Sequence, residues 1–304
     1  MLRALLDAGY HVRALARSRS LPSHAPRLPD DDRLEIVEGD LCDTGAFAKA
    51  LDGCRYVVHT AALYSFTPRD RAAMQRVNVV GTESLLAAAH LAGVQRAILT
   101  SSSSTLAAIP HGDAYHQSKI AQERAAFASR VPVVALLPTA PIGPGDWKPT
   151  PTGKLVLDFL RGRITARAPG SGGMNLVAVE DVASAHVAAL TRGSPGERYP
   201  LGGENLSMDA IWHMLADATA KPMPSWRAPY ALALATAYVD EIRCRIDPRA
   251  TPFAPLEGVR LARERMYADS SKAIDELGFR PTPARAAVER AVAWYREAGE
   301  GTWR

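Results

Sequence analysis

Hydrophobic and polar positions follow two periods along this chain. In several segments apolar residues recur every three or four positions, which is typical of helices with one buried face. We predict these helices at residues 1–8, 44–51, 70–92, 115–129 and 207–219, with another starting at 155–160. Short alternating or continuous apolar runs predict strands at 10–16, 34–37, 56–59, 97–99 and 133–137. Strands that alternate with helices in this way predict an α/β fold with a doubly wound parallel sheet.

The composition narrows the class of protein. Of the 304 residues, 47% are hydrophobic and 22% are charged, as in soluble globular proteins. The net charge of +4 comes from scattered arginines without a basic block, so we expect no nucleic-acid partner. Cys42, Cys54 and Cys244 have neither metal nor redox spacing, which favours reduced thiols in a cytoplasmic protein.

Membrane insertion is not predicted. A spanning helix requires about 20 apolar residues, and the chain has no such run and no signal-peptide pattern at its start. Residues 231–239 are apolar and rich in small side chains. We predict a packing helix of the C-terminal part there, and a peripheral contact with a membrane is the alternative.

Tyr115 and Lys119 are the first candidates for chemistry. Their spacing places both side chains on one face of the predicted helix, one turn apart. A neighbouring ammonium lowers the pKa of a phenol from its ordinary value of about 10, so this pair suits proton transfer. The same spacing arises by chance on solvated helix faces, and taken alone it leaves both interpretations open. His59 and His186 lack partners at metal-ligand spacing, so we expect no metal site and interpret both as core or helix-face histidines.

The order of the motifs is more specific than any one of them. They are Glu38-Gly39-Asp40-Leu41, His59-Thr60-Ala61-Ala62, Asn78-x-x-Gly81-Thr82, Thr100-Ser101-Ser102, Tyr115-x-x-x-Lys119 and Pro138-x-x-x-x-Gly143-Pro144-Gly145. Over almost its whole length the chain resembles the extended short-chain dehydrogenase/reductases of the NAD-dependent epimerase/dehydratase family. Within that family, segments 141–153 and 196–205 resemble the hopanoid-associated sugar epimerases, which are close kin of the dihydroflavonol-reductase-like proteins.

The resemblance implies a Rossmann-like fold with a small C-terminal substrate lobe. We expect residues 1–150 to form the NAD(P)-binding domain, which also receives later segments near 175–190. Residues 151–304 would then mainly form the substrate-binding lobe.

The resemblance also assigns roles to the candidate residues. Tyr115 would be the general acid/base, and Lys119 would hold the nicotinamide ribose and lower the pKa of the tyrosine. Ser102 would bind the substrate oxygen; four consecutive serines leave this choice ambiguous, and Ser103 is a candidate for contact with substrate. Tyr64, Trp147 and Met174 are further candidates to line the substrate site, although core packing explains each of them equally well.

Cofactor contacts follow the ends of the predicted strands. Arg17 lies where the family meets the adenosine ribose, and no carboxylate occupies positions 10–29, so a 2′-phosphate and therefore NADP is favoured over NAD. An exposed arginine without a ligand, like Arg19, is the alternative. Asp40 and Leu41 resemble the pair that flanks the adenine, and a turn is the alternative for Asp40.

Small side chains fit close under a dinucleotide, so Thr60, Ala61 and Ala62 are expected to pass beneath it, or to serve tight strand-to-helix packing. Asn78 has two possible roles, a catalytic one and a bond to the backbone at a neighbouring strand end. Pro138 resembles the residue that packs on the nicotinamide, with a structural turn as the alternative.

The chain departs from the family pattern at its start. The family opens with a strand and a glycine-rich turn, whose backbone N–H groups and following helix N-terminus hold the pyrophosphate. Met1 already falls inside that helix, and the missing strand would be central, between 10–16 and 56–59. We expect a truncated or misassigned start, and a family member that has lost nucleotide binding is the alternative.

These residues predict an NAD(P)-dependent enzyme that oxidises or reduces a hydroxyl or carbonyl of a small sugar-like or hopanoid-linked molecule. A sugar epimerase is the first hypothesis, and an NADPH-dependent carbonyl reductase uses the same residues. A hypothesis of another class is a non-catalytic remnant that binds a partner or ligand. A homodimer is compatible with all three.

Overall fold

The computed structural model describes residues 1–17, 27–65, 68–106, 114–167, 172–247 and 256–298. The chain divides into two compact units, each assembled from three segments. Unit 1 comprises Met1–Thr139, Val179–Leu201 and Asp269–Pro281, and unit 2 comprises Ala140–Ala178, Gly202–Ala268 and Thr282–Arg304. The assignment of nucleotide binding to residues 1–150 and of substrate binding to 151–304 stays a prediction.

The main sheet of unit 1 is parallel throughout, as the alternating elements predicted. Its strands are β3 (Tyr56–His59), β4 (Arg96–Thr100), β5 (Val133–Pro138) and β8 (Arg198–Leu201), in that order across the sheet. All six residues of β5 are buried, as expected for a strand covered on both faces. Strand β8 was not among the predicted strands.

A second, two-stranded parallel sheet in unit 1 pairs β1 (Val12–Ala16) with β2 (Leu34–Glu38). Among the described strands, no ladder joins β1 to β3, so each is an edge. The ring of Tyr10, two residues before β1, meets the ring of Tyr56, the first residue of β3, edge to face at 6.3 Å. The two strands expected to flank a central strand are therefore neighbours at their starts without being paired.

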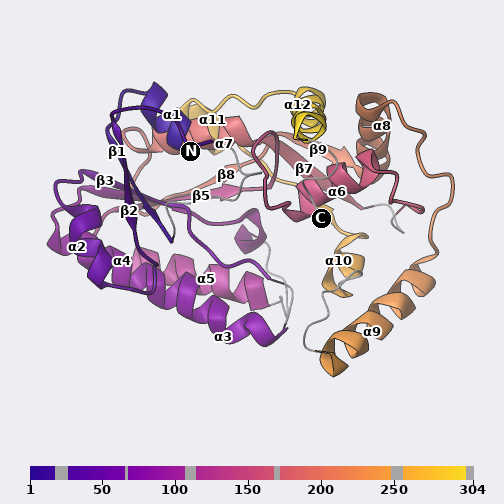
Figure 1. Ribbon diagram of the computed structural model, residues 1–304, viewed down its shortest axis with the longest axis horizontal. Helices are drawn as coiled ribbons and strands as arrows, with labels where there is room; N and C mark the ends of the chain where they lie inside the picture. Colours follow the sequence, from indigo (N-terminus) through magenta and orange to yellow (C-terminus); the bar gives the residue numbers. More distant parts are fainter. Residues whose placement is uncertain (18–26, 66–67, 107–113, 168–171, 248–255, 299–304) are drawn as a thin grey trace. The chain divides into compact units, whose positions relative to one another are not determined.

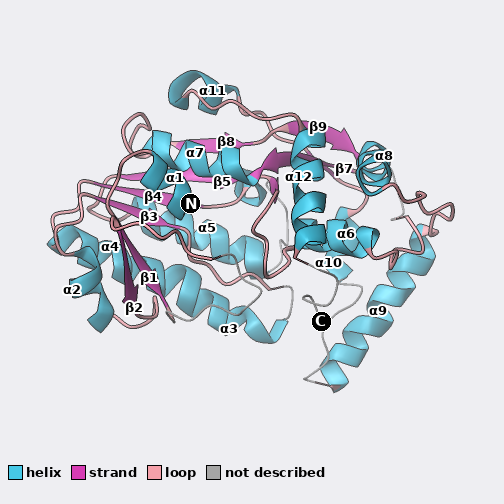
Figure 2. Cartoon of the chain, turned by 45° about the horizontal axis from the view of Figure 1, so that its top comes forward, coloured by secondary structure: helices cyan, strands magenta, loops and turns pink. Residues whose placement is uncertain are grey.

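Helices cover both faces of the main sheet (Figures 1 and 2), with α4 and α5 on one face and α7 and α11 on the other. The helical bounds in unit 1 are α1 (Leu2–Asp7), α2 (Gly45–Leu51), η1 (Pro68–Asp70), α3 (Arg71–Met74), α4 (Gly81–Leu91), η3 (Ser103–Leu106), α5 (Ala114–Phe127), α7 (Val179–Ala189) and α11 (Ser271–Leu277). The predicted helix at 70–92 is not uniform, because a π-helical segment, η2 (Gln75–Val80), separates α3 from α4. Such segments are rare and often occur at functional sites.

Unit 2 has its own sheet and core. Strand β7 (Gly173–Ala178) pairs with β6 (Ala140–Ile142) and β10 (Arg265–Met266) in parallel and with β9 (Glu204–Ser207) antiparallel. Helices α6 (Pro151–Leu160), α8 (Met208–Thr219) and α12 (Ala284–Glu297) contribute the buried apolar side chains. In this core the rings of Phe159 and Trp212 are stacked at 6.0 Å.

Helix α9 (Tyr230–Ile246) is longer and more exposed than the apolar run at 231–239 predicted. Only Ala237 and Asp240 are buried, and Val239 is 65% exposed. The prediction of a packing helix is therefore wrong for most of its length, although α9 contacts α10 (Leu256–Leu261). None of the helices in the described residues is long and apolar enough to cross a membrane.

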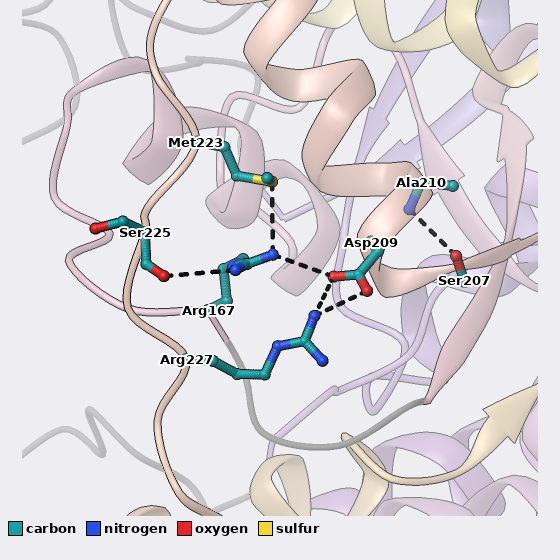
Figure 3. Close-up of polar contacts among 7 residues, drawn as sticks. All are labelled: Arg167, Ser207, Asp209, Ala210, Met223, Ser225 and Arg227. Atoms are coloured by element: carbon teal, nitrogen blue, oxygen red, sulfur yellow. Dashed lines mark hydrogen bonds and ion pairs between the residues drawn. The ribbon is translucent and has the colours of Figure 1, made fainter.

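An ion-pair cluster fixes the segment before α9 to the start of α8 (Figure 3). Arg227 places Nη2 at 2.7 and 2.8 Å from the two carboxylate oxygens of Asp209, and Arg167 Nη1 lies 3.4 Å from the same carboxylate. The backbone of Arg167 also pairs with Trp226 and Ala228. Asp209 lies in the first turn of α8, where a negative charge is favoured.

Candidate active site

Several predicted site residues lie at one edge of the main sheet. Because its strands are parallel, their carboxyl ends share this edge, where α/β proteins bind ligands. Thr60–Ala62 follow β3 and are exposed, Ser101–Ser104 follow β4, and Pro138 is the buried last residue of β5. The parallel arrangement of β3, β4 and β5 is therefore sufficient to bring three of the predicted segments to the same edge of the sheet.

Helix α5 contributes Tyr115 and Lys119. Tyr115 is half-buried, and its ring meets that of Tyr64 edge to face at 4.5 Å. Lys119 is 1% exposed, and its Nζ donates to the carbonyl of Thr100 at 2.8 Å and to Gln122 Oε1 at 2.5 Å. Burial lowers the pKa of Lys119 to about 8, and the charge of Glu123 opposes this shift. The ammonium is thus anchored at the end of β4, one residue before the serines.

The serine segment is a turn with hydrogen bonds among its own residues. Ser102 Oγ accepts from the backbone N–H of Ser104 at 3.2 Å and from its hydroxyl at 3.0 Å. Thr105 Oγ1 lies 2.8 Å from the carbonyl oxygen of Ser102. Ser102 is half-buried, whereas Ser101 is buried, so Ser102 remains the better candidate for a substrate oxygen.

Glu123, which was not among the predicted site residues, secures this turn. Its carboxylate accepts from the hydroxyls of Ser101 and Thr105, the latter at 2.6 Å, and lies 2.9 Å from Arg198 Nε. Glu123 is buried and stands one turn after Lys119 on α5. That spacing was visible in the sequence, but its partners on β8 and in the turn were not.

Asn78 projects from the π-helical segment into the interior and is 0% exposed. Its Oδ1 accepts from the backbone N–H of Leu63 at 2.7 Å, and its Nδ2 donates to the carbonyl of Leu63 at 3.0 Å. The same Nδ2 lies 3.0 Å from Ser118 Oγ. Of the two roles considered for Asn78, these bonds describe the structural one, since they hold the loop that follows β3.

The adenosine-side candidates stand at the ends of β1 and β2. Arg17 is exposed directly after β1, whereas Arg19 lies outside the described residues. Asp40 Oδ1 accepts from the backbone N–H of Cys42 at 2.8 Å, so Asp40 has the turn role in addition to any role toward adenine. Leu41 is buried and packs against Gly81, where a Cβ would come within 2.9 Å of Leu41 Cγ.

The remaining candidates serve the cores of their units. Trp147 and Met174 are partly buried against the core of unit 2. His59 bonds to Thr82 Oγ1 at 2.8 Å, and His186 to Thr100 Oγ1 at 2.7 Å. Both histidines are buried, and burial lowers the pKa of each to about 4, with the charge of Lys119 contributing at His59.

The nicotinamide end of a dinucleotide fits this edge. An ammonium has three N–H donors, and the bonds to Thr100 and Gln122 use two of those of Lys119, which leaves one for a ribose hydroxyl. The side chains of Thr60, Ala61 and Ala62 are small and exposed, and they follow β3, the strand that pairs with β4. Tyr115 presents a half-buried phenol one helical turn before Lys119. Unit 1 thus contains a proton donor (Tyr115), a cation (Lys119) and a segment of exposed small side chains (residues 60–62).

The family model of the NAD dependent epimerase/dehydratase family matches residues 1–202, which include this whole edge. The chain belongs to that family. The predicted family, the Rossmann-like fold class and the assignment as an enzyme are therefore confirmed, and the cofactor class is a nicotinamide dinucleotide.

Relatives of this family member agree with that assignment. A Synechocystis protein provisionally named a dihydroflavonol 4-reductase is 37% identical, over 98% of this chain and 91% of its own. "Sterol demethylase protein B" of Methylococcus capsulatus is 34% identical, over 98% of this chain and 95% of its own. The crystal structure of gox2253 matches with a TM-score of 0.82 and 33% identity, over 98% of this chain and 94% of that one. The chain is an oxidoreductase-type enzyme of the extended short-chain dehydrogenase/reductase family.

Proposed function

We propose that this enzyme transfers a hydride between a nicotinamide dinucleotide and a secondary alcohol or ketone on the ring system of a hopanoid-linked molecule. The arrangement of Tyr115 and Lys119 carries the proposal, because it sets a half-buried phenol one turn from an ammonium anchored at the end of β4. The names of the relatives support the substrate class, since dihydroflavonols and sterols are ring systems that bear alcohol or ketone groups.

The proposed chemistry divides between cofactor and protein. The nicotinamide, when bound, accepts or supplies the hydride at the carbinol carbon. In the oxidative direction the phenolate oxygen of Tyr115 takes the hydroxyl proton of the substrate, and in the reductive direction the phenol returns it. The ammonium of Lys119 favours the phenolate, and Ser102 Oγ donates to the substrate oxygen.

Replacing Tyr115 by Phe tests this proposal. General acid–base groups contribute about 100- to 10,000-fold to rates, so we expect Tyr115→Phe to lower turnover by about that factor. The melting temperature should stay close to that of the parent protein, because the ring contact with Tyr64 is retained. Initial rates of NADPH oxidation with a 3-keto steroid as the probe give the comparison.

Tyr56→Phe, on the edge strand β3, is the matched control and should retain activity. Equal rates for the parent and Tyr115→Phe would remove the mechanism.

NADP is the proposed cofactor, because Arg17 is exposed directly after β1 and suits a 2′-phosphate. We expect NADPH to bind more tightly than NADH, and Arg17→Asp to abolish that difference. Titration of both dinucleotides against both proteins measures it. Equal affinities in the parent protein would count against the assignment.

A sugar epimerase is the second candidate, because segments 141–153 and 196–205 resemble the hopanoid-associated sugar epimerases. An epimerase returns the hydride to the opposite face of the same carbon and therefore needs only catalytic amounts of cofactor. A reductase oxidises one NADPH for each product molecule. Measuring cofactor consumption against product therefore separates the two.

A further inference from the structure

Lys119 belongs to a buried hydrogen-bond network whose other members were not among the predicted site residues. The hydrogen bonds lead from its ammonium to Gln122 and then to Thr82 and His59. Each of these residues is at most 4% exposed. Gln122 stands three residues after Lys119 on α5, whereas Thr82 is on α4 and His59 ends β3. Helix α5, helix α4 and strand β3 therefore all contribute side chains around the Gln122 amide, whose oxygen accepts from the ammonium.

The direction of each bond follows from Thr82. Its single hydroxyl hydrogen goes to the carbonyl of Asn78, one turn earlier in the helix, at 2.7 Å. Thr82 Oγ1 can therefore only accept from its other neighbours. Gln122 Nε2 lies 3.0 Å from Thr82 Oγ1 and His59 Nε2 lies 2.8 Å from it, so both nitrogens must donate.

This constraint fixes the amide of Gln122. With its NH₂ group toward Thr82, the amide must present its carbonyl to Lys119 Nζ, 2.5 Å away. The flipped amide would bring an NH₂ group against the ammonium and a carbonyl against a hydroxyl with no hydrogen to give. His59 reinforces the arrangement, since its Nε2–H occupies the other accepting position of Thr82.

We propose that Gln122 is a positioning residue of the reaction, which keeps the Lys119 side chain charged and pointed at the end of β4 by means of an amide that Thr82 orients. A bond from a charged donor is stronger than one from a neutral donor, so the carbonyl stabilises the ammonium over the amine. Burial acts in the opposite direction, and Glu123 is the other group that favours the charged form. Without Gln122, Lys119 would lose its proton at a lower pH and support Tyr115 less.

The test follows the titration of Lys119 itself and needs no substrate. The chain has only six lysines, so ¹³Cε-lysine labelling gives a simple spectrum, and Lys119→Met assigns the signal. In the parent protein we expect Lys119 to titrate near its pKa of about 8. In Gln122→Met its midpoint should fall by about one pH unit or more, and in Gln122→Glu it should rise above that of the parent.

Matched variants guard against indirect effects. Gln117→Met changes a glutamine on the same helix that is exposed and bonds to Arg71, and it should leave the titration of Lys119 unchanged. If Gln122→Met does not fold, Thr82→Val removes the orienting hydroxyl and should shift the midpoint the same way, whereas Thr82→Ser should restore it. Midpoints equal to the parent in both Gln122→Met and Thr82→Val would overturn the proposal.

The consequence for turnover rests on the proposed function. Because Lys119 must be charged, Gln122→Met should move the alkaline limb of the pH–rate profile for the 3-keto steroid to lower pH, by the same amount as the titration. A shifted titration without measurable turnover in the parent protein would leave the role of Gln122 standing and remove the proposed substrate. If the titration of Lys119 does not shift and the parent enzyme is active, the proposed substrate stands and the proposed role of Gln122 is removed.

Discussion

Two asparagines make the same pair of hydrogen bonds in different surroundings. In unit 1, Asn78 bonds to both the N–H and the carbonyl of Leu63, at 2.7 and 3.0 Å. In unit 2, Asn205 bonds to both the N–H and the carbonyl of Ala268, at 3.0 and 3.1 Å. Asn78 is 0% exposed, whereas Asn205 is exposed to solvent.

The difference lies in what replaces a lost bond. Water can reach the exposed Asn205, so its two bonds to Ala268 contribute little net stability, although its Oδ1 also accepts from Nδ2 of the buried Asn175 at 2.7 Å. The groups around Asn78 have no such substitute, and each buried donor or acceptor left unpaired costs about 1–3 kcal/mol. Lys119, Gln122, Thr82, His59 and Asn78 thus form one connected buried network, while the Arg167–Asp209–Arg227 cluster consists of partly solvated ion pairs. We therefore expect unit 1 to be the more sensitive to mutation and pH.

Acidification should produce the largest effect. His59 and His186, both in unit 1, have folded-state pKa values of about 4 against 6.5 in the unfolded chain. Between these values the unfolded state binds more protons, so stability falls as the pH falls through that window. From pH 7 to pH 5 the two histidines together should cost about 4 kcal/mol.

Urea unfolding at the two pH values, followed by far-UV circular dichroism, measures this loss. A free energy of unfolding that stays level between pH 7 and pH 5 would contradict the account of the two histidines.

Asn78→Ala should have the next largest effect. It leaves both backbone groups of Leu63 without their partner, so we expect a loss of about 3 kcal/mol in the free energy of unfolding. All five tryptophans lie in segments of unit 2, so circular dichroism must follow this variant, because tryptophan fluorescence reports on unit 2. A loss below about 1 kcal/mol would show that water reaches this part of the loop.

Asn205→Ala should have the smallest effect, about 1 kcal/mol, because water can reach the exposed position and only Nδ2 of the buried Asn175 loses a partner that water replaces less readily. Tryptophan fluorescence during urea unfolding is the suitable measurement for this unit. A loss equal to that of Asn78→Ala would end the distinction between the two asparagines. A smaller loss for Asn205→Ala than for Asn78→Ala would show that burial, and not the bond pattern, determines how much each asparagine contributes to the free energy of unfolding.

Much of the fold was predictable because it rests on local periodicity. The segments 34–37, 56–59, 97–99 and 133–137 became β2 to β5 with shifts of about one residue, which is within the usual uncertainty of such boundaries. Strand β8 was missed because Arg198–Leu201 has only four residues and contains a proline. Helix α9 was misjudged because apolar character does not show which face a helix buries.

By itself the sequence determined the α/β class, the family and the pairing of Tyr115 with Lys119. These follow from period, motif order and helical spacing, which act over a few residues. Only the tertiary structure decided that Gln122 orients toward Lys119, that Asn78 holds Leu63 and that Glu123 secures the serine turn. One of these contacts, between Asn78 and Ser118, joins residues that are 40 positions apart along the chain. The physical reason is that a buried polar group must find its partner wherever the packed elements place one, and that placement is not encoded in local spacing.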